Sequence, residues 1–355
     1  MKICFIAGFN GGGTERAAFL LANELQKHHE VYILNKSPDR PTFPLKAAHL
    51  DYLPRKGVIP TIFAIRKYIR ANRIDLMIIL EALGGICALP AACFCKCRTI
   101  VWEHANYYQT QGCSYNRFVR QMELLFADAY VVLTRRDLNT FRERYPHIRT
   151  ELVQIYNIAE LGQEEKYDPD SKTIVSAGHI SKIKNFSVIP RIAAQVFENH
   201  SDWKWKIYGE RADDEYERLE ENINRYRMTE KVLLCGRCSD MDTVYREASV
   251  YVMTSLQEGF PMVLLEAKSH HLPIVSFDIE TGPDELIRDG ENGFLVPPYE
   301  TEKMAEKIER LLNEKDLRMR FSGKAADGLE NITKEKIAAQ WLALFEKIRR
   351  KKENA

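Results

Sequence analysis

Two carboxylates eight positions apart stand in the segment SLQEGFPMVLLEAKSHHLPIVSF, residues 255–277. Glu258 precedes a Gly-Phe-Pro turn, and Glu266 lies within the apolar run that follows this turn. Charged side chains are rarely buried without a partner, so two carboxylates in this setting indicate that each binds something. The structural alternative is that Glu258 caps a helix and Glu266 faces solvent.

The turn between the two carboxylates is typical of a site that binds anions. Pro261 suits the first turn of a helix, where the backbone N–H groups have no partner inside the helix. These N–H groups and the positive end of the helix dipole attract phosphate. We therefore expect the turn residues to bind a phosphorylated ligand; they are Gly259, Phe260, Pro261 and Met262.

The composition fits two domains without a membrane span. The 355 residues suit two domains of about 150 to 180 residues each. No apolar run approaches the roughly 20 residues that cross a bilayer. In the first segment, MKICFIAGFNGGG, the glycines follow too early for a secretory signal, so we expect a buried first strand there.

The eight cysteines do not have the spacing of a metal site. A zinc site needs two Cys-x-x-Cys pairs or added histidines, and only Cys235 and Cys238 form such a pair. The cysteines of CFCKC alternate along the chain instead. We expect no metal ligands, and reduced cysteines that pack as small apolar residues in a cytoplasmic protein.

The charge is distributed unevenly along the chain. Residues 1–160 contain 21 Lys and Arg against 14 Asp and Glu, whereas the rest of the chain is acidic. A basic half suits an anionic membrane surface or a phosphorylated substrate. No other feature of the sequence favours nucleic acid as a partner.

Short apolar runs alternate with amphipathic helical patterns along the chain. The first pair is a predicted strand at residues 2–9 and a predicted helix at 14–28. Buried strands separated by such helices are typical of a parallel sheet with helices on both faces. The pattern restarts after EEKYDPDSK, residues 164–172, which we interpret as a linker. We expect an α/β protein with two Rossmann-like, doubly wound domains that face each other across a ligand cleft.

The segment EGFPMVLLEAKSHHLPIVSFDIETGPDELIRDGENGFLV resembles the signature region of the retaining glycosyltransferases of family 4, which have the GT-B architecture. Their hallmark is a pair of glutamates separated by seven residues, which Glu258 and Glu266 match. Further resemblances cover most of the chain: GGGTERAAFLLANEL, VWEHANY, ADAYVVLT and SAGHISKIKNF.

The resemblance implies how the chain is divided. Residues 1–163 are then a Rossmann-like domain that binds the acceptor, and residues 172–335 are a Rossmann-like domain that binds a sugar nucleotide. Residues 336–355 are expected to form a C-terminal helix that packs back toward the first domain.

The resemblance also assigns roles to side chains. Glu258 binds the donor sugar and Glu266 the ribose, while His104, at a strand end, helps to position the sugar. The alternative for His104 is a hydrogen-bonded histidine in a strand-end loop. Gly12 and Gly13 let the backbone approach the diphosphate or the acceptor closely.

Positive charge beside the leaving diphosphate is the largest catalytic contribution that we identify. The family supplies an arginine and a lysine five positions apart; here Lys184 matches, but His179 replaces the arginine. A histidine carries full charge only below about pH 6.5, so Lys184 is the firmer candidate. No Asp-x-Asp stands at a strand end, so we expect no metal cofactor. The resemblance implies that the donor is a UDP- or GDP-sugar.

The predicted function is transfer of a hexose or N-acetylhexosamine to a glycan or polyprenyl-linked acceptor, with retention of configuration. We expect a role in bacterial capsule, lipopolysaccharide or exopolysaccharide synthesis. Two alternatives remain: a non-catalytic subunit that binds a sugar nucleotide, and a sugar-nucleotide epimerase of the same architecture.

A basic helix predicted near residues 61–73 raises the question of membrane contact. It combines apolar with basic side chains, as in helices that lie on anionic lipid. Alternatively, it packs its apolar face on the sheet and leaves a solvated basic face. We expect a cytoplasmic enzyme that can contact the inner face of the cell membrane through its basic first domain. The residues concerned are Ile62, Phe63, Ile65, Arg66, Lys67, Ile69, Arg70 and Arg73.

Overall fold

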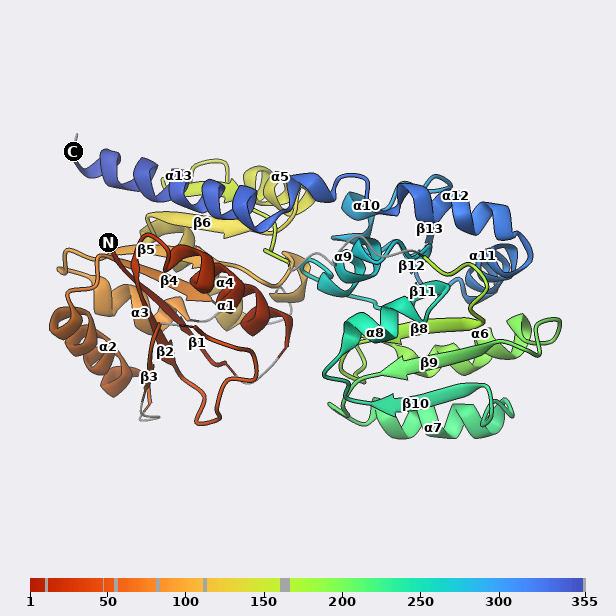
Figure 1. Cartoon of the computed structure of the whole chain (residues 1–355). Coiled ribbons are helices and arrows are strands. Elements are labelled where there is room, and N and C mark those ends of the chain that lie inside the picture. Colours follow the sequence, from red (N-terminus) through yellow and green to blue (C-terminus); the bar gives the residue numbers. More distant parts are fainter. Residues whose placement is uncertain are drawn as a thin grey trace. The chain divides into compact units, whose positions relative to one another are not determined.

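The computed structural model describes residues 1–9, 12–46, 48–53, 57–80, 84–110, 114–159 and 167–353. The chain forms two compact units (Figure 1). The first unit consists of Met1–Glu160 and Asn331–Ala355, and the second of Leu161–Glu330. Each unit contains one sheet whose neighbouring strands pair in parallel, so the prediction of two Rossmann-like domains is confirmed. Residues 164–166 of the predicted linker lie outside the described residues.

The first unit has a seven-stranded sheet in the order β3-β2-β1-β4-β5-β6-β7. Its strands are β1 (Lys2–Ala7), β2 (Glu30–Asn35), β3 (His49–Tyr52), β4 (Leu76–Leu80), β5 (Arg98–Trp102), β6 (Ala129–Val132) and β7 (Glu151–Gln154). Its helices are α1 (Gly13–Leu25), α2 (Val58–Asn72), α3 (Gly85–Ala92), α4 (Ser114–Phe126), α5 (Arg135–Arg144) and α13 (Lys334–Glu353), with a short 3₁₀ turn, η1 (Tyr108–Thr110).

The second unit has a six-stranded sheet in the order β10-β9-β8-β11-β12-β13. Its strands are β8 (Thr173–Ala177), β9 (Lys204–Tyr208), β10 (Val232–Gly236), β11 (Val250–Met253), β12 (Ile274–Phe277) and β13 (Gly293–Val296). Its helices are α6 (Ile189–Val196), α7 (Glu215–Arg225), α8 (Met241–Arg246), α9 (Met262–Ser269), α10 (Pro283–Leu286), α11 (Thr301–Asn313) and α12 (Lys315–Ala325). Two 3₁₀ turns are η2 (Phe186–Val188) and η3 (Leu329–Asn331).

In both sheets, the strand order reverses at a corresponding place. The chain proceeds outward to one side of β1 and then returns to place β4 on its other side, and it does the same around β8 and β11. In open α/β sheets, ligands bind beyond the carboxyl ends of the strands at such a point. Within each unit, the loops that follow these central strands are therefore the places to look for a site.

The central strands are buried because they are apolar on both faces. Every residue of β4, LMIIL, is buried, as are the last five residues of β1. Helices must therefore cover both faces of each sheet. In the first unit, α2 packs on α3 and α3 packs on α4, whereas α1 packs on α13.

Helix α13 completes the core of the first unit. Its apolar residues recur at helical spacing, and Ile337, Trp341 and Phe345 are all buried. The ring centroids of Trp341 and Trp102 lie 4.9 Å apart. In Figure 1, the dark blue α13 runs along the unit that also contains the N-terminus.

Several elements differ from the sequence-based prediction. Strands β3 and β7 and helices α3, α10 and α12 are not predicted from the apolar pattern. Within α2, Ile65 and Ile69 are buried, so this face packs against the domain as a crossover helix does, while Phe63 remains exposed. No helix among the described residues is long and apolar enough to cross a bilayer.

Candidate functional site

The loops that follow β8 and β11 are bonded to each other beyond the carboxyl ends of these neighbouring strands. Leu256 N donates to Ile183 O at 2.8 Å, and Thr254 Oγ1 donates to Lys184 O at 2.9 Å. The first loop carries Lys184 and the second carries Glu258. The two side chains are therefore brought together at the point where the strand order reverses.

Lys184 and Glu258 form an ion pair. Lys184 Nζ donates to Glu258 Oε1 at 2.6 Å, and the two side chains are only 17% and 13% exposed. Gly178, just after β8, has φ 143°, and a Cβ there would lie 2.8 Å from Lys184 Cε. Glycine is therefore suited to this position both for its backbone conformation and for the space that the lysine occupies.

Helix α9 begins directly after the turn that carries Glu258. Pro261 is its N-cap residue, and no side-chain hydrogen bond caps the helix among the residues described. The turn is held from the loop that follows β12, because Thr281 Oγ1 donates to Glu258 O at 2.6 Å. Gly282 has φ 106°, and a Cβ there would lie 2.3 Å from Pro261 Cδ, so glycine permits the close approach of the two loops.

The remaining turn residues are shielded from solvent. Phe260, Pro261 and Met262 are buried, and Gly259 is half-buried. Packing of these residues fixes the direction in which the first N–H groups of α9 point. A helix start of this kind can receive phosphate oxygens through its N–H groups and its dipole.

Glu266 lies in the second turn of α9 and has a partner within the protein. Its side chain is 8% exposed, and Tyr245 Oη, from α8, donates to its Oε2 at 2.8 Å. The Tyr245 ring packs beside His270, with 5.2 Å between the ring centroids. Both Glu258 and Glu266 thus have protein partners, besides the donor sugar and the ribose to which the resemblance assigns them.

His179 and Lys182 lie near Lys184 in sequence but in different surroundings. His179 is exposed on the loop after β8. Lys182 Nζ lies 2.8 Å from Asp214 Oδ1 in a surface ion pair. Of the basic residues in GHISKIKN, Lys184 is therefore the one that the structure holds beside Glu258.

Gly12 and Gly13 form the start of α1, after the central strand β1. Gly12 is the N-cap residue with φ 94°, a conformation that glycine adopts without strain. No side-chain hydrogen bond caps this helix among the described residues. The preceding Gly11 of the GGGTER segment lies outside them.

His104 follows β5 and is neutral at physiological pH. Burial lowers its pKa to about 3. Its Nε2 is shielded from solvent and has no hydrogen-bond partner among the described residues, and its ring lies 4.6 Å from that of Trp102. A neutral imidazole nitrogen in this setting is available to a ligand group.

Glu103 holds the loop that carries His104. Its Oε1 accepts from Ala105 N at 2.9 Å, while its Oε2 accepts from Tyr130 Oη at 2.9 Å and from Arg120 at 3.3 Å. Glu103 and Arg120 are each 1% exposed. Charge-assisted bonds of this kind in a buried setting fix the geometry of the loop rather than bind a ligand.

Two further carboxyls belong to the same buried region of the first unit. Burial raises the pKa of Glu123 well above its usual range, and Gly85 N donates to its Oε1 at 3.0 Å. Burial also raises the pKa of Asp137 to about 6, although its Oδ1 accepts from Tyr107 N at 3.0 Å. The region around His104 therefore contains several buried ionisable side chains, among them Glu123 and Asp137.

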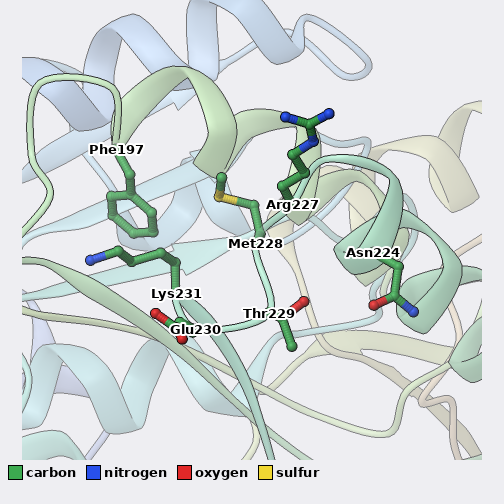
Figure 2. A pocket seen from close by; sticks show the side chains of 7 residues that line it. All are labelled: Phe197, Asn224, Arg227, Met228, Thr229, Glu230 and Lys231. Atoms are coloured by element: carbon green, nitrogen blue, oxygen red, sulfur yellow. The ribbon is translucent and has the colours of Figure 1, made fainter.

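A separate pocket of about 390 Å³ lies elsewhere in the second unit (Figure 2). Its lining includes the end of α7 and the segment that leads into β10. This is the amino end of β10, opposite to the strand ends where Lys184 and Glu258 lie, so we do not regard the pocket as the main site. It is lined by Phe197, Asn224, Arg227, Met228, Thr229, Glu230 and Lys231.

Two family models together match nearly the whole chain. Residues 157–327 match the model for glycosyl transferases group 1, and residues 11–162 match the model for glycosyltransferase family 4. This chain is a family 4 glycosyltransferase.

Similar proteins agree with this assignment. The amylovoran biosynthesis glycosyltransferase AmsD of Erwinia amylovora is 26% identical, over 94% of this chain and 95% of the relative. A Campylobacter jejuni alpha-1,4-N-acetyl-D-galactosaminyltransferase, whose acceptor is an undecaprenol-linked saccharide, is 26% identical over 98% of this chain and 99% of its own length. The crystal structure of Anabaena HepE with UDP superposes with a TM-score of 0.83 at 17% identity, over 98% of this chain and 100% of that one. The fold is GT-B.

Part of this glycosyltransferase site has no signal in the sequence. Tyr245 contacts Glu266 from a different helix, and Thr281 holds the Glu258 turn from the loop after β12. Both contacts join distant parts of the chain. Within the described residues, no three His, Cys, Asp or Glu side chains form a cluster that could hold a metal ion.

Proposed function

We propose that this family 4 glycosyltransferase transfers a hexose or N-acetylhexosamine from a UDP- or GDP-sugar, with retention of configuration, to a glycan or polyprenyl-linked acceptor. The observation that carries the proposal is the Lys184–Glu258 pair beside the uncapped start of α9. This arrangement places an ammonium group, a carboxylate and the N-terminal end of a helix within one small region. An activated sugar with a diphosphate leaving group requires these three functions.

Lys184 and the start of α9 are proposed to stabilise the leaving diphosphate. Charge that develops on the phosphate oxygens is stabilised most by groups that are already held in place. Lys184 is held by Glu258 and by the packing against Gly178. These groups supply the positive charge that a divalent cation would otherwise provide, so we propose a metal-independent transfer.

Glu258 and Glu266 are proposed to bind the two ends of the donor. Glu258 lies on the turn and accepts hydrogen bonds from the sugar hydroxyls. Glu266 lies in the second turn of α9 and accepts from the ribose. The hydroxyl of Tyr245 orients the Glu266 carboxylate for this contact.

Retention of configuration is proposed to follow from attack on the face that the diphosphate leaves. The leaving phosphate accepts the proton of the acceptor hydroxyl while the new glycosidic bond forms. His104, neutral because of its lowered pKa, is proposed to position the donor sugar as a hydrogen-bonding group rather than as a charged acid.

The test begins with donor binding. A panel of UDP- and GDP-sugars is measured by thermal shift, and we expect one donor to stabilise the protein selectively, with the effect lost in Glu266→Ala. The absence of a thermal shift with every donor would contradict the proposal. The anomeric configuration of the product, measured by NMR, tests retention.

Replacement of the arginine by His179 favours one alternative, a subunit that binds the donor without catalysing transfer. In that case the parent protein would bind the donor, but Glu258→Ala would leave the product of the pathway unchanged. An epimerase would instead yield an isomerised sugar nucleotide from the donor alone. We expect neither result.

We also propose that the enzyme acts in bacterial surface polysaccharide synthesis, in the cytoplasm and at the inner face of the membrane. Its similarity to AmsD and to the Campylobacter transferase supports this setting. A polyprenyl-linked acceptor would require the protein to work beside a lipid bilayer.

A further inference from the structure

Helix α4 has an unusual distribution of side chains. A helix on the surface of a domain normally turns its apolar side chains inward and its charged side chains outward. In α4, the charged residues Arg120 and Glu123 are buried, whereas Phe118, Leu125 and Phe126 are 59%, 60% and 71% exposed. The domain core does not explain three large apolar groups in solvent.

The neighbouring helices continue this apolar surface. On α2, Ile59 and Phe63 are one turn apart and are both exposed. Phe94, which follows α3, is 94% exposed. Among the described residues, the only other large apolar side chain that is exposed to more than 55% is Tyr299, in the second unit.

Contacts between the helices show that these side chains belong to one layer. Helix α3 packs against both α2 and α4. The Arg66 guanidinium of α2 donates to the carbonyls of Pro90, at 2.6 Å, and Ala91, at 3.2 Å, at the end of α3. It also donates to Cys93 O, so the segment that carries Phe94 is fixed beside α2.

The same layer is basic on its exposed side. Lys67, Arg70 and Arg73 are exposed on or next to α2, and Lys96 and Arg117 are exposed near α3 and on α4. The sequences of α2, α3 and the segment 93–98 contain no Asp or Glu, and the one carboxylate of α4, Glu123, is buried. Within these elements, the exposed apolar groups are thus accompanied by positive charges, although Asp51 and Asp75 are exposed near α2.

We propose that the outer surface of α2, α3 and α4 docks on an anionic phospholipid bilayer. We call it the docking surface and define it by Ile59, Phe63, Phe94, Phe118, Leu125 and Phe126. Its apolar groups enter the boundary between headgroups and acyl chains, while the basic side chains contact the lipid phosphates. The proposal rests on the proposed function, since a polyprenyl-linked acceptor is held in such a bilayer.

The charge pattern favours lipid over a second copy of this chain. A two-fold dimer brings the same patch of both copies together. Lys67 and Arg70 of one copy would then approach the same residues of the other copy. The helices that form the docking surface provide no exposed carboxylate to pair with them. An anionic bilayer has the complementary charge.

The test is co-sedimentation of the full chain with vesicles of phosphatidylcholine, alone or mixed with phosphatidylglycerol. We expect binding to the mixed vesicles, which weakens as salt is added. Phe118→Ser with Phe126→Ser should weaken this binding by about tenfold or more. Lys67→Gln with Arg70→Gln should weaken it by about fivefold for each charge removed.

The control variant is Tyr299→Ser with Met319→Ser, which removes exposed apolar side chains from the second unit; it should bind vesicles as the parent does. Every variant should keep its donor-induced thermal shift, because the replaced side chains are exposed. This readout separates failure of membrane docking from failure of the proposed function. Equal binding by all variants, equal binding to neutral vesicles, or a dimer that Phe118→Ser with Phe126→Ser dissociates in light scattering would overturn the proposal.

Discussion

Replacement of Lys184 by methionine separates two roles of this lysine. The change keeps the length of the side chain but removes the ammonium group, so Glu258 is left without its 2.6 Å partner while 13% exposed. A fully buried pair that is broken on one side costs about 3–5 kcal/mol, and solvent access reduces this to about 1–2 kcal/mol here. Loss of charge beside the leaving diphosphate should also lower kcat by about 100-fold or more.

The double variant Lys184→Met with Glu258→Gln provides the decisive measurement. Because it removes both charges, the free energy of unfolding should return to within about 0.5 kcal/mol of the parent in denaturant titrations. Activity, measured as release of the nucleoside diphosphate, should be lower than in Glu258→Gln alone, because the double variant also lacks the positive charge beside the leaving group. If the double variant were as active as Glu258→Gln, the lysine would have only a structural role and our account of the leaving group would be wrong.

Three further predictions concern the surroundings of the site. Burial raises the pKa of Asp137 from 3.8 to about 6, so the folded state binds the proton more tightly than the unfolded state. The stabilisation by protonated Asp137 is fully present below about pH 4 and is lost as the pH rises through 6. The free energy of unfolding, measured relative to that of Asp137→Asn, should therefore fall by about 3 kcal/mol between these two limits. A difference between the two proteins that is independent of pH would refute this. Tyr245→Phe should raise the Kd of the donor by about three- to tenfold in calorimetry, since Glu266 loses one orienting bond, and an unchanged Kd would show that the hydroxyl has no such role. Gly178→Ala and Gly290→Ala should each destabilise the protein by about 1–3 kcal/mol, because both glycines have a positive φ. Only Gly178→Ala should also lower activity, because a Cβ at Gly178 would meet the Lys184 side chain, whereas a Cβ at Gly290 meets nothing within 4 Å.

The sequence was sufficient to predict the repeated α/β architecture, because most strands are apolar runs and most helices show a regular spacing. Strand β3 was missed for a physical reason: HLDY is only four residues long, contains no continuous apolar run and lies at the edge of the sheet, where three of its four residues are exposed. Helix α3 was missed because GICALPAA is apolar on all sides and contains Pro90.

The candidate site was predictable as a set of residues but not as a set of contacts. Lys184 and Glu258 are 74 positions apart, and only the adjacency of β8 and β11 brings them together. The same holds for Tyr245 and Glu266. That α4 buries Arg120 and exposes Phe118 could not be predicted from the sequence, because helical spacing alone does not determine which face of a helix packs against the core.

The return of α13 to the first unit has a consequence for biosynthesis. Trp341 packs against Trp102 and thereby fills the interior of the unit that the ribosome makes first. That interior stays incomplete while the entire second unit is being translated, so the nascent N-terminal part must persist with an uncovered apolar face. A stop codon or proteolytic cut before Lys334 should therefore damage the beginning of the protein more than the region next to the cut.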